Sequence, residues 1–146
     1  MIVRPGGLLV RAGRLLLMRY TYGGDSRYNI PGGKPDPGED LRQCLIRELT
    51  EELNLHVKPG KLVFLVESIG GEREVLHPLF HLEVSGSADP LLNQDQTSAL
   101  EVLWLDAVQV RQLTLYPHIP DALARWLEGI SPDTPYLGRV DQPWAT

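Results

Sequence analysis

The apolar residues of this chain follow two spacings, one typical of strands and one typical of helices. Short runs rich in Val, Leu and Phe, bounded by turn-forming residues, predict β-strands. These predicted strands cover residues 2–10, 14–20, 55–57, 61–69, 75–84 and 101–105. Ala12 and Gly13 separate the first two strands, so we expect a tight hairpin there.

After residue 40 the apolar spacing becomes helical. When positions are stepped by about 100° per residue, one side of the segment collects a continuous apolar stripe. Its members are Leu41, Leu45, Ile46, Leu49 and Leu53. This stripe predicts an amphipathic helix that begins at residue 40 or 41 and packs on a core. Shorter helices are predicted at residues 107–113 and 121–128.

The strand at residues 75–84 carries two histidines on one of its faces. Alternation places Pro78, Phe80, Leu82 and Val84 on one side and His77, Leu79, His81 and Glu83 on the other. We expect one of these faces to be core. Zinc is disfavoured for the histidine pair, because the sequence offers no third ligand at a suitable spacing.

Residues 21–29 (TYGGDSRYN) show no clear period. Two tyrosines and two glycines suit either a loop or stacking on a nucleotide base. We favour the loop, and keep Tyr28 as a candidate substrate contact.

Residues 131–146 hold three prolines and little periodicity. They are interpreted as a tail that either wraps the domain or, in a homodimer, reaches a partner subunit, with Tyr136 and Trp144 as candidate anchors. The predicted organisation is therefore one domain over residues 1–130 and a C-terminal tail over residues 131–146.

Length and charge narrow the class of protein. The 146 residues suit one domain that buries a core without disulfides. A formal net charge of −5 argues against binding to a long nucleic-acid backbone, which requires a basic surface. The single cysteine, Cys44, is expected to be a core or boundary residue. The sequence has no apolar run of roughly 18 residues and no signal-peptide pattern, so we expect a cytoplasmic protein that does not bind membranes.

Three glutamates lie beside the apolar stripe of the long helix. Glu48, Glu51 and Glu52 fall within an arc about 100° wide, because residues three and four apart are neighbours on a helix. Such like charges repel, by roughly 0.2–0.5 kcal/mol per pair in water, and Arg47 can offset only part of this. A solvated, Glu-rich helix face is one explanation. A hard cation such as Mg²⁺, which prefers oxygen ligands, is the other.

The segment before this helix favours the cation. Gly32, Gly33 and Gly38 alternate with prolines in a turn that Glu39 closes, and glycines allow a close approach of the backbone. Backbone N–H groups and the positive end of a helix then face a place where phosphate oxygens can bind. Together, the turn and the helix predict a divalent-metal site for a phosphate compound.

The segment GKPDPGEDLRQCLIRELTEELNL resembles the signature of the Nudix hydrolase family. The matching positions are Gly33, Glu39, Arg47, Glu48, Leu49, Glu51, Glu52 and Leu55. Asn54 stands where the family usually has glycine, and we expect it to form the same left-handed helix end. The resemblance implies an α/β fold, a three-layer α/β/α sandwich around a mixed β-sheet.

The resemblance also implies an activity: hydrolysis of a pyrophosphate bond in a nucleoside diphosphate linked to another moiety, such as a nucleoside triphosphate or a nucleotide sugar. The expected cofactor is Mg²⁺, with Mn²⁺ as a substitute. By position, Glu48, Glu51, Glu52 and the carbonyl of Gly32 would bind the metal and Arg47 would orient the carboxylates. Gly33 and Arg19 would contact substrate, although Arg19 equally suits a solvated strand end.

The general base stays open at this point. Glu51 and Glu52 are candidates, since each is close to the expected metal. Many family members instead carry a loop base about six residues before a strand tryptophan. If that tryptophan is Trp104, the position holds Ser98, and the nearest carboxylates are Asp95 and Glu101. The missing base keeps an alternative function in view, a non-catalytic module that binds a nucleotide or metabolite and regulates a partner.

Overall fold

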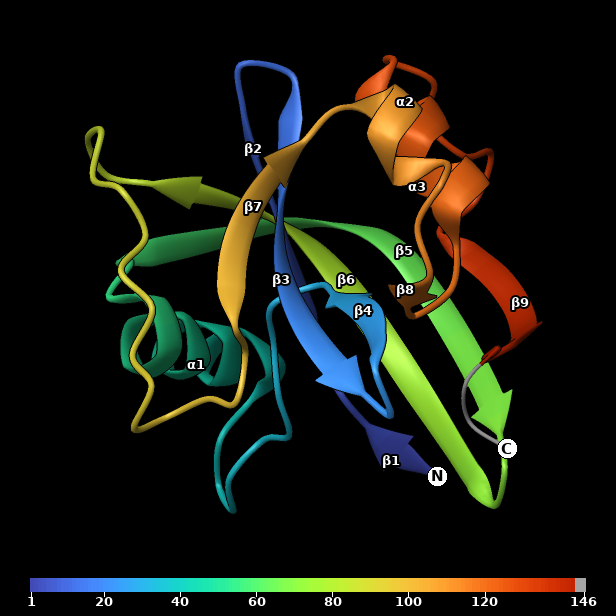
Figure 1. The fold of residues 1–146 in the computed structure, drawn as a ribbon, viewed down its shortest axis with the longest axis horizontal. Coiled ribbons are helices and arrows are strands. Elements are labelled where there is room, and N and C mark those ends of the chain that lie inside the picture. The colour runs from blue at the N-terminus through green and yellow to red at the C-terminus, as the bar shows by residue number, and fades with distance from the viewer. Residues whose placement is uncertain (144–146) are drawn as a thin grey trace.

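The computed structural model describes residues 1–143. Its strands are β1 (Ile2–Val3), β2 (Gly6–Arg11), β3 (Arg14–Tyr22), β4 (Asp25–Asn29), β5 (Val57–Gly70), β6 (Arg73–Val84), β7 (Glu101–Leu105), β8 (Leu115–Tyr116) and β9 (Tyr136–Asp141). Its helices are α1 (Leu41–Leu53), α2 (Ala107–Val110) and α3 (Pro120–Leu127) (Figure 1). None of the helices within residues 1–143 is long and apolar enough to cross a membrane.

The strands form one mixed sheet. Along the sheet the order is β8-β4-β3-β2-β6-β5-β9, while β1 pairs with β6 and β7 pairs with β3. The pairs β2–β6, β1–β6, β4–β8 and β5–β9 are parallel and the others are antiparallel. Long-range pairing of this kind brings the N-terminal strands beside the middle of the chain.

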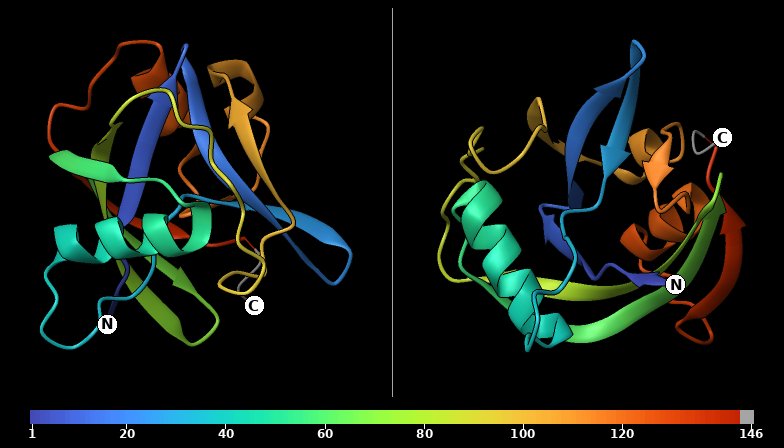
Figure 2. Two further views of the ribbon diagram at one scale, coloured as in Figure 1. Left: turned by 90° about the vertical axis from the view of Figure 1, so that its left-hand side faces the viewer. Right: turned by 90° about the horizontal axis from the view of Figure 1, so that it is seen from below.

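Two cores lie on opposite faces of the sheet. On β3, Leu15 and Leu17 pack in a cluster with residues of α2 and α3, whereas Leu16 and Met18 pack in a cluster with α1. Figures 1 and 2 show α1 well separated from the pair α2 and α3. The expected three-layer α/β/α sandwich around a mixed sheet is therefore confirmed.

Helix α1 has the ends that the sequence indicated. Asp40 is the N-cap, and its side chain accepts a hydrogen bond from the backbone N–H of Gln43, whose side chain bonds back to Asp40. Asn54 ends the helix in the left-handed conformation, with φ 52° and ψ 37°, as expected for a residue in place of glycine. The fully buried Cys44 lies on the core side of this helix, which confirms its prediction.

The hairpin between β2 and β3 is also confirmed. Arg11 pairs with Arg14, and the two loop residues Ala12 and Gly13 have φ values of 52° and 74°. Positive φ at both central residues matches the twist of the flanking strands, which is why two-residue hairpins favour it.

The expectation that only one face of residues 75–84 is core was wrong. Leu79 packs in the cluster beside α2 and α3, and Phe80 and Leu82 pack in the cluster beside α1. Strand β6 is interior to the sheet and has helices beyond both faces, so side chains of both faces are buried in the middle of the strand, whereas Glu74 and Glu83 near its ends are exposed. His77 is fully buried as a result.

The loop predicted at residues 21–29 was wrong as well. Strand β3 continues to Tyr22, and β4 pairs with it antiparallel from Asp25 to Asn29. Two other boundaries differ. The strands expected at 55–57 and 61–69 are replaced by one strand, β5, which begins at Val57, and the helix expected at 107–113 ends at Val110.

The C-terminal segment contains a strand that the sequence analysis missed. Strand β9 pairs parallel with β5, so this part of the chain lies along the edge of the sheet. The hydroxyl of Tyr136 donates a hydrogen bond to Glu67 on β5, as suits an anchor. The other candidate anchor, Trp144, lies outside the described residues.

Candidate functional site

Arg47 organises the carboxylates around α1. Its guanidinium donates two hydrogen bonds to Glu39, at 2.8 and 2.9 Å, one to Glu48 at 3.0 Å and one to Glu51 at 3.2 Å. A further N–H reaches the carbonyl of Lys34 at 3.2 Å. These contacts hold the pKa of the Glu39 carboxyl down at about 2, chiefly through the hydrogen bond from Arg47. The turn and the helix are thereby joined through one side chain.

The glycine turn lies directly against its neighbours. The N–H of Gly33 bonds to the carbonyl of Pro5 at 3.3 Å, and Gly6 and Gly32 form an isolated β-bridge. A β-carbon on Gly32 would come within 2.1 Å of the Pro5 carbonyl oxygen. A β-carbon on Gly33 would stand 2.4 Å from Glu48 Oε1. At Gly32 backbone atoms leave no room for a side chain, whereas at Gly33 a side chain would force the Glu48 carboxylate to move.

Of the three glutamates on α1, Arg47 donates hydrogen bonds to Glu48 and Glu51 but not to Glu52. Burial, and next the charge of Glu48, raise the pKa of Glu52 to about 7. Burial also raises the pKa of Glu48, despite the hydrogen bond from Arg47. Two partly desolvated carboxyl groups one helical turn apart form a place where a bound cation would relieve repulsion.

Thr97 is a contact of Glu52 that the sequence analysis did not find. Its hydroxyl lowers the pKa of the Glu52 carboxyl against the effect of burial and lies 3.2 Å from the hydroxyl of Tyr20. The loop that carries Thr97 is fixed to the end of α1, where Leu91 N–H bonds to Leu53 O and Asn93 N–H to Glu52 O, both at 2.8 Å. Only this tertiary contact brings Thr97 to the helix.

The oxygen donors fit a magnesium ion better than a transition metal. Within residues 1–143, no group of three or more His, Cys, Asp or Glu side chains could hold a metal ion by itself. Mg²⁺ does not require such a group, because one or two carboxylates, retained waters and substrate phosphate oxygens usually complete its coordination. Glu48 and Glu52 offer that smaller set, and Gly33, the residue after Gly32, lies against the Glu48 carboxylate.

The candidate loop bases differ in how they are engaged. Glu101, a candidate base, accepts a hydrogen bond from Arg19 at 2.6 Å. Arg19, the candidate phosphate contact, is therefore paired with that carboxylate. Asp95 is exposed in the 93–96 turn, and Ser98 is exposed beside it. Trp104 lies on β7 opposite Leu16, with the Arg11 guanidinium over its ring.

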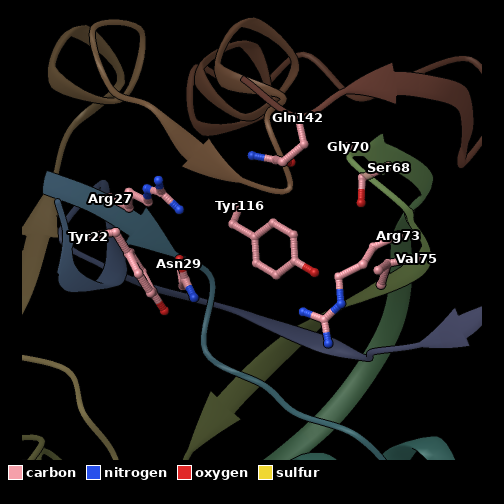
Figure 3. Close-up of a pocket in the computed structure, with 9 residues that line it drawn as sticks. All are labelled: Tyr22, Arg27, Asn29, Ser68, Gly70, Arg73, Val75, Tyr116 and Gln142. Carbon is pink, nitrogen blue, oxygen red and sulfur yellow. The ribbon is translucent and has the colours of Figure 1, made fainter. Parts of the chain in front are cut away.

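A cavity of about 300 Å³ has Asn29 in its lining, shortly before the glycine turn in the sequence. Figure 3 shows the ring of Tyr116 at its centre, with side chains from β3 and β4 on one side and from β5 and β6 on the other. Its lining residues are Tyr22, Arg27, Asn29, Ser68, Gly70, Arg73, Val75, Tyr116 and Gln142. We call this cavity the aromatic pocket, since its walls combine tyrosine rings with amide and guanidinium groups.

Tyr28, the candidate substrate contact, is not among the residues that line the aromatic pocket. It packs against the core cluster beside α2 and α3, while its neighbours Arg27 and Asn29 reach the cavity. Alternation along β4 explains the difference, because successive side chains point to opposite faces. Tyr22, from the same predicted loop, does line the cavity.

Gln142 closes the aromatic pocket from the C-terminal side. Its side-chain N–H donates to Leu115 O at 2.7 Å and its carbonyl accepts from His118 N–H at 3.1 Å. Its backbone N–H bonds to Ile69 O at 2.9 Å. Gln142 therefore joins the end of β5 to the segment that carries Tyr116.

Comparisons with known proteins agree with this arrangement. A family model described as the NUDIX domain matches residues 3–127. A CTP pyrophosphohydrolase of Escherichia coli (strain K12) is 33% identical over 84 residues, which are 56% of this chain and 58% of that protein. The alignment thus spans somewhat more than half of the relative's length.

Two solved structures share the fold at low sequence identity. A MutT protein from Methanosarcina mazei Go1 superposes with a TM-score of 0.72 and 23% identity, over 88% of this chain and 93% of that one. An ADP-ribose pyrophosphatase from Streptococcus suis 89-1591 gives a TM-score of 0.67 and 17% identity, over 94% of this chain and 97% of that one. These likenesses concern the fold alone.

Proposed function

The chain belongs to the Nudix family, and on that premise we propose that it is a Mg²⁺-dependent pyrophosphohydrolase of a nucleotide. The bond cleaved is a phosphoric anhydride in a nucleoside diphosphate linked to another moiety. Nucleoside triphosphates are the first substrate class to consider, because the curated relative is a CTP pyrophosphohydrolase. Mn²⁺ is the expected substitute for Mg²⁺.

The observation that carries the proposal is the unequal pairing of the α1 carboxylates. Arg47 holds Glu48 and Glu51, whereas Glu52 is partly buried beside Glu48 without a guanidinium partner among the described residues. A module that only binds a ligand gains nothing from this repulsion, which lowers stability. An enzyme that needs a hard cation next to a phosphate gains its binding site from it.

Roles follow from these positions. Glu48, Glu51, Glu52 and the carbonyl of Gly32 are proposed to hold the ion, which, when bound, neutralises phosphate charge and activates a water. Arg47 fixes the carboxylates on α1. Glu52 is favoured over Glu101 and Asp95 as the proton acceptor, because Glu101 is bound to Arg19 and Asp95 is exposed.

The aromatic pocket is proposed to receive the nucleoside. Tyr22 and Tyr116 contribute aromatic rings, one face of each lying against an arginine, and the opposite faces would stack on a base. Asn29 contributes an amide group that can hydrogen-bond to the edge of the base. The chain runs from Asn29 in this pocket into the glycine turn, where Gly33 lies against Glu48 on α1, so the phosphates of a nucleotide in the pocket would extend along this turn toward α1.

Hydrolysis of a substrate panel tests the proposal. Wild type would be assayed for phosphate or pyrophosphate release from nucleoside triphosphates with CTP first, then nucleotide sugars, ADP-ribose and dinucleoside polyphosphates, each with Mg²⁺ or Mn²⁺. Glu52→Gln should reduce kcat by at least about tenfold, since it removes charge and metal affinity together. Glu83→Gln, an exposed glutamate on β6, is the matched control and should retain wild-type rates.

Two results would contradict the proposal. One is a wild-type protein that hydrolyses nothing in the panel with either metal. The other is a Glu52→Gln variant that keeps full activity. Tight calorimetric binding of a nucleotide without any turnover would instead support the non-catalytic module.

A further inference from the structure

Arg4 is a basic residue that the preceding argument has not used. It follows β1, and its backbone N–H bonds to Leu76 O on β6 at 2.8 Å. The next residue, Pro5, accepts the hydrogen bond from Gly33 N–H. The backbone of Arg4 is thus fixed between the central sheet and the glycine turn, which limits where its side chain can reach.

The side chain of Arg4 extends toward the aromatic pocket. One of its N–H groups donates to Ile30 O at 3.3 Å, immediately before the glycine turn. Its guanidinium carbon lies 5.3 Å from the centre of the Tyr116 ring, which forms the middle of that pocket. A guanidinium held on an aromatic face keeps most of its five donors available for an anion.

Arg4 lies close to both proposed halves of the site. Its neighbour Pro5 holds Gly33, which lies against the Glu48 carboxylate, and its charge lowers the pKa of the Tyr116 hydroxyl against the effect of burial. Arg4 nevertheless forms no ion pair within residues 1–143, unlike Arg19 and Arg47, whose guanidinium groups are paired with carboxylates. A cation in this position lacks an anion.

We propose that Arg4 binds the substrate's phosphate groups between the α1 carboxylates and the aromatic pocket. This inference rests on the proposed function, since the anion it assigns is the diphosphate of the nucleotide. The planar guanidinium of Arg4 can donate two parallel N–H groups to phosphate oxygens, and its contact with the Tyr116 ring fixes its orientation. Arg4 would thus supply the phosphate contact that the family resemblance implied for Arg19.

Three variants test this inference. Arg4→Gln removes the charge, Arg4→Lys keeps it without the fork, and Arg14→Gln removes an exposed charge at the β2–β3 hairpin as a matched control. On the preferred substrate, we expect Arg4→Gln to raise KM at least about tenfold, Arg4→Lys to restore part of the loss, and Arg14→Gln to stay within about twofold.

Binding measurements separate phosphate recognition from a structural role. In calorimetric titrations with Mg²⁺ present, Arg4→Gln should lower the affinity for inorganic pyrophosphate at least about tenfold. Its affinity for the phosphate-free nucleoside should change less than about twofold. The inference is overturned if pyrophosphate affinity is unchanged, or if nucleoside and pyrophosphate affinity fall together with the melting temperature. Pyrophosphate binding decides the matter even for a wild type without turnover, so failure of this inference is distinguishable from failure of the proposed function.

Discussion

The carboxylate of Glu48 lies against the α-carbon of Gly33, so that a β-carbon at position 33 would stand 2.4 Å from Glu48 Oε1. No heavy atoms approach that closely without a bond or a hydrogen bond. The glycine turn and α1 are therefore fitted to each other at the point where a metal is proposed to bind.

Substitution of Gly33 by alanine should displace the Glu48 carboxylate. We expect kcat to fall at least about tenfold and the Mg²⁺ concentration for half-maximal activity to rise, because a proposed ligand moves. Gly60→Ala is the control, since its β-carbon would make only an ordinary contact, 3.5 Å from His81 O. Metal titration of the activity of both variants is the measurement, and equal Mg²⁺ requirements would argue against Glu48 as a ligand.

Replacement of Arg47 by lysine should also impair activity. A lysine keeps the charge but cannot hold Glu39 by two parallel hydrogen bonds while reaching Glu48 and Glu51. We expect a loss of roughly tenfold or more in kcat/KM. Arg111→Lys is the matched control, because Arg111 binds Glu128 with two N–H groups, far from α1 in sequence, between α2 and α3. Steady-state kinetics on both variants are the measurement. If kcat/KM of Arg111→Lys fell as much as that of Arg47→Lys, the loss would reflect impaired folding rather than the α1 carboxylates.

Glu52 should make the metal-free protein less stable as the pH rises. Its pKa is about 7 in the folded state and 4.5 as the reference value, so the folded state binds more protons between these values and stability declines from pH 4.5 to 7. Glu52→Gln should therefore melt at a higher temperature than wild type at pH 7.5, but not at pH 4.5. Melting curves in a chelator provide the measurement.

Added Mg²⁺ should make wild type melt at a higher temperature than Glu52→Gln at pH 7.5. Because the ion is proposed to bind carboxylates, it should raise the melting temperature of wild type at pH 7.5 and have much less effect on Glu52→Gln. Equal stabilisation of the two proteins would show that Glu52 is not a ligand.

His77 should produce the opposite pH dependence. Burial lowers its pKa from 6.5 to about 3, and its Nε2 lies 2.8 Å from the Ser68 hydroxyl oxygen. The folded state binds fewer protons than the unfolded state, so stability is complete above pH 6.5 and is lost as the pH falls toward 3, by at most about 1.4 kcal/mol per pH unit. Urea unfolding of wild type and His77→Gln between pH 4 and 7 should show a smaller acid loss in the variant. If the free energy of unfolding of the two proteins fell equally with decreasing pH, His77 would not be the source of the acid loss.

The elements that the sequence predicted well are those in which local and tertiary forces agree. Helix α1 has a continuous apolar stripe, a capping pair at Asp40 and Gln43, and a residue at its end that tolerates positive φ. Its carboxylates could be assigned to one face because helical geometry fixes their relation. The family resemblance covered this same segment.

The elements that were missed depend on distant partners. Strand β4 reads DSRYN, without apolar alternation, and exists because β3 pairs along its whole length. Strand β9 likewise depends on the edge of β5. Arg4 and Thr97 show nothing unusual in the sequence, because their significance comes from Tyr116 and Glu52, which only the folded chain brings near them.

Gln142 gives the two ends of the proposed reaction separate origins in the chain. The groups on α1 that would cut the anhydride come from the first half of the sequence, whereas the wall that would recognise the nucleoside is completed by a residue that follows the last strand. On the proposed roles, a substitution of Gln142 would alter the choice of nucleotide and leave the Arg47 contacts on α1 unchanged.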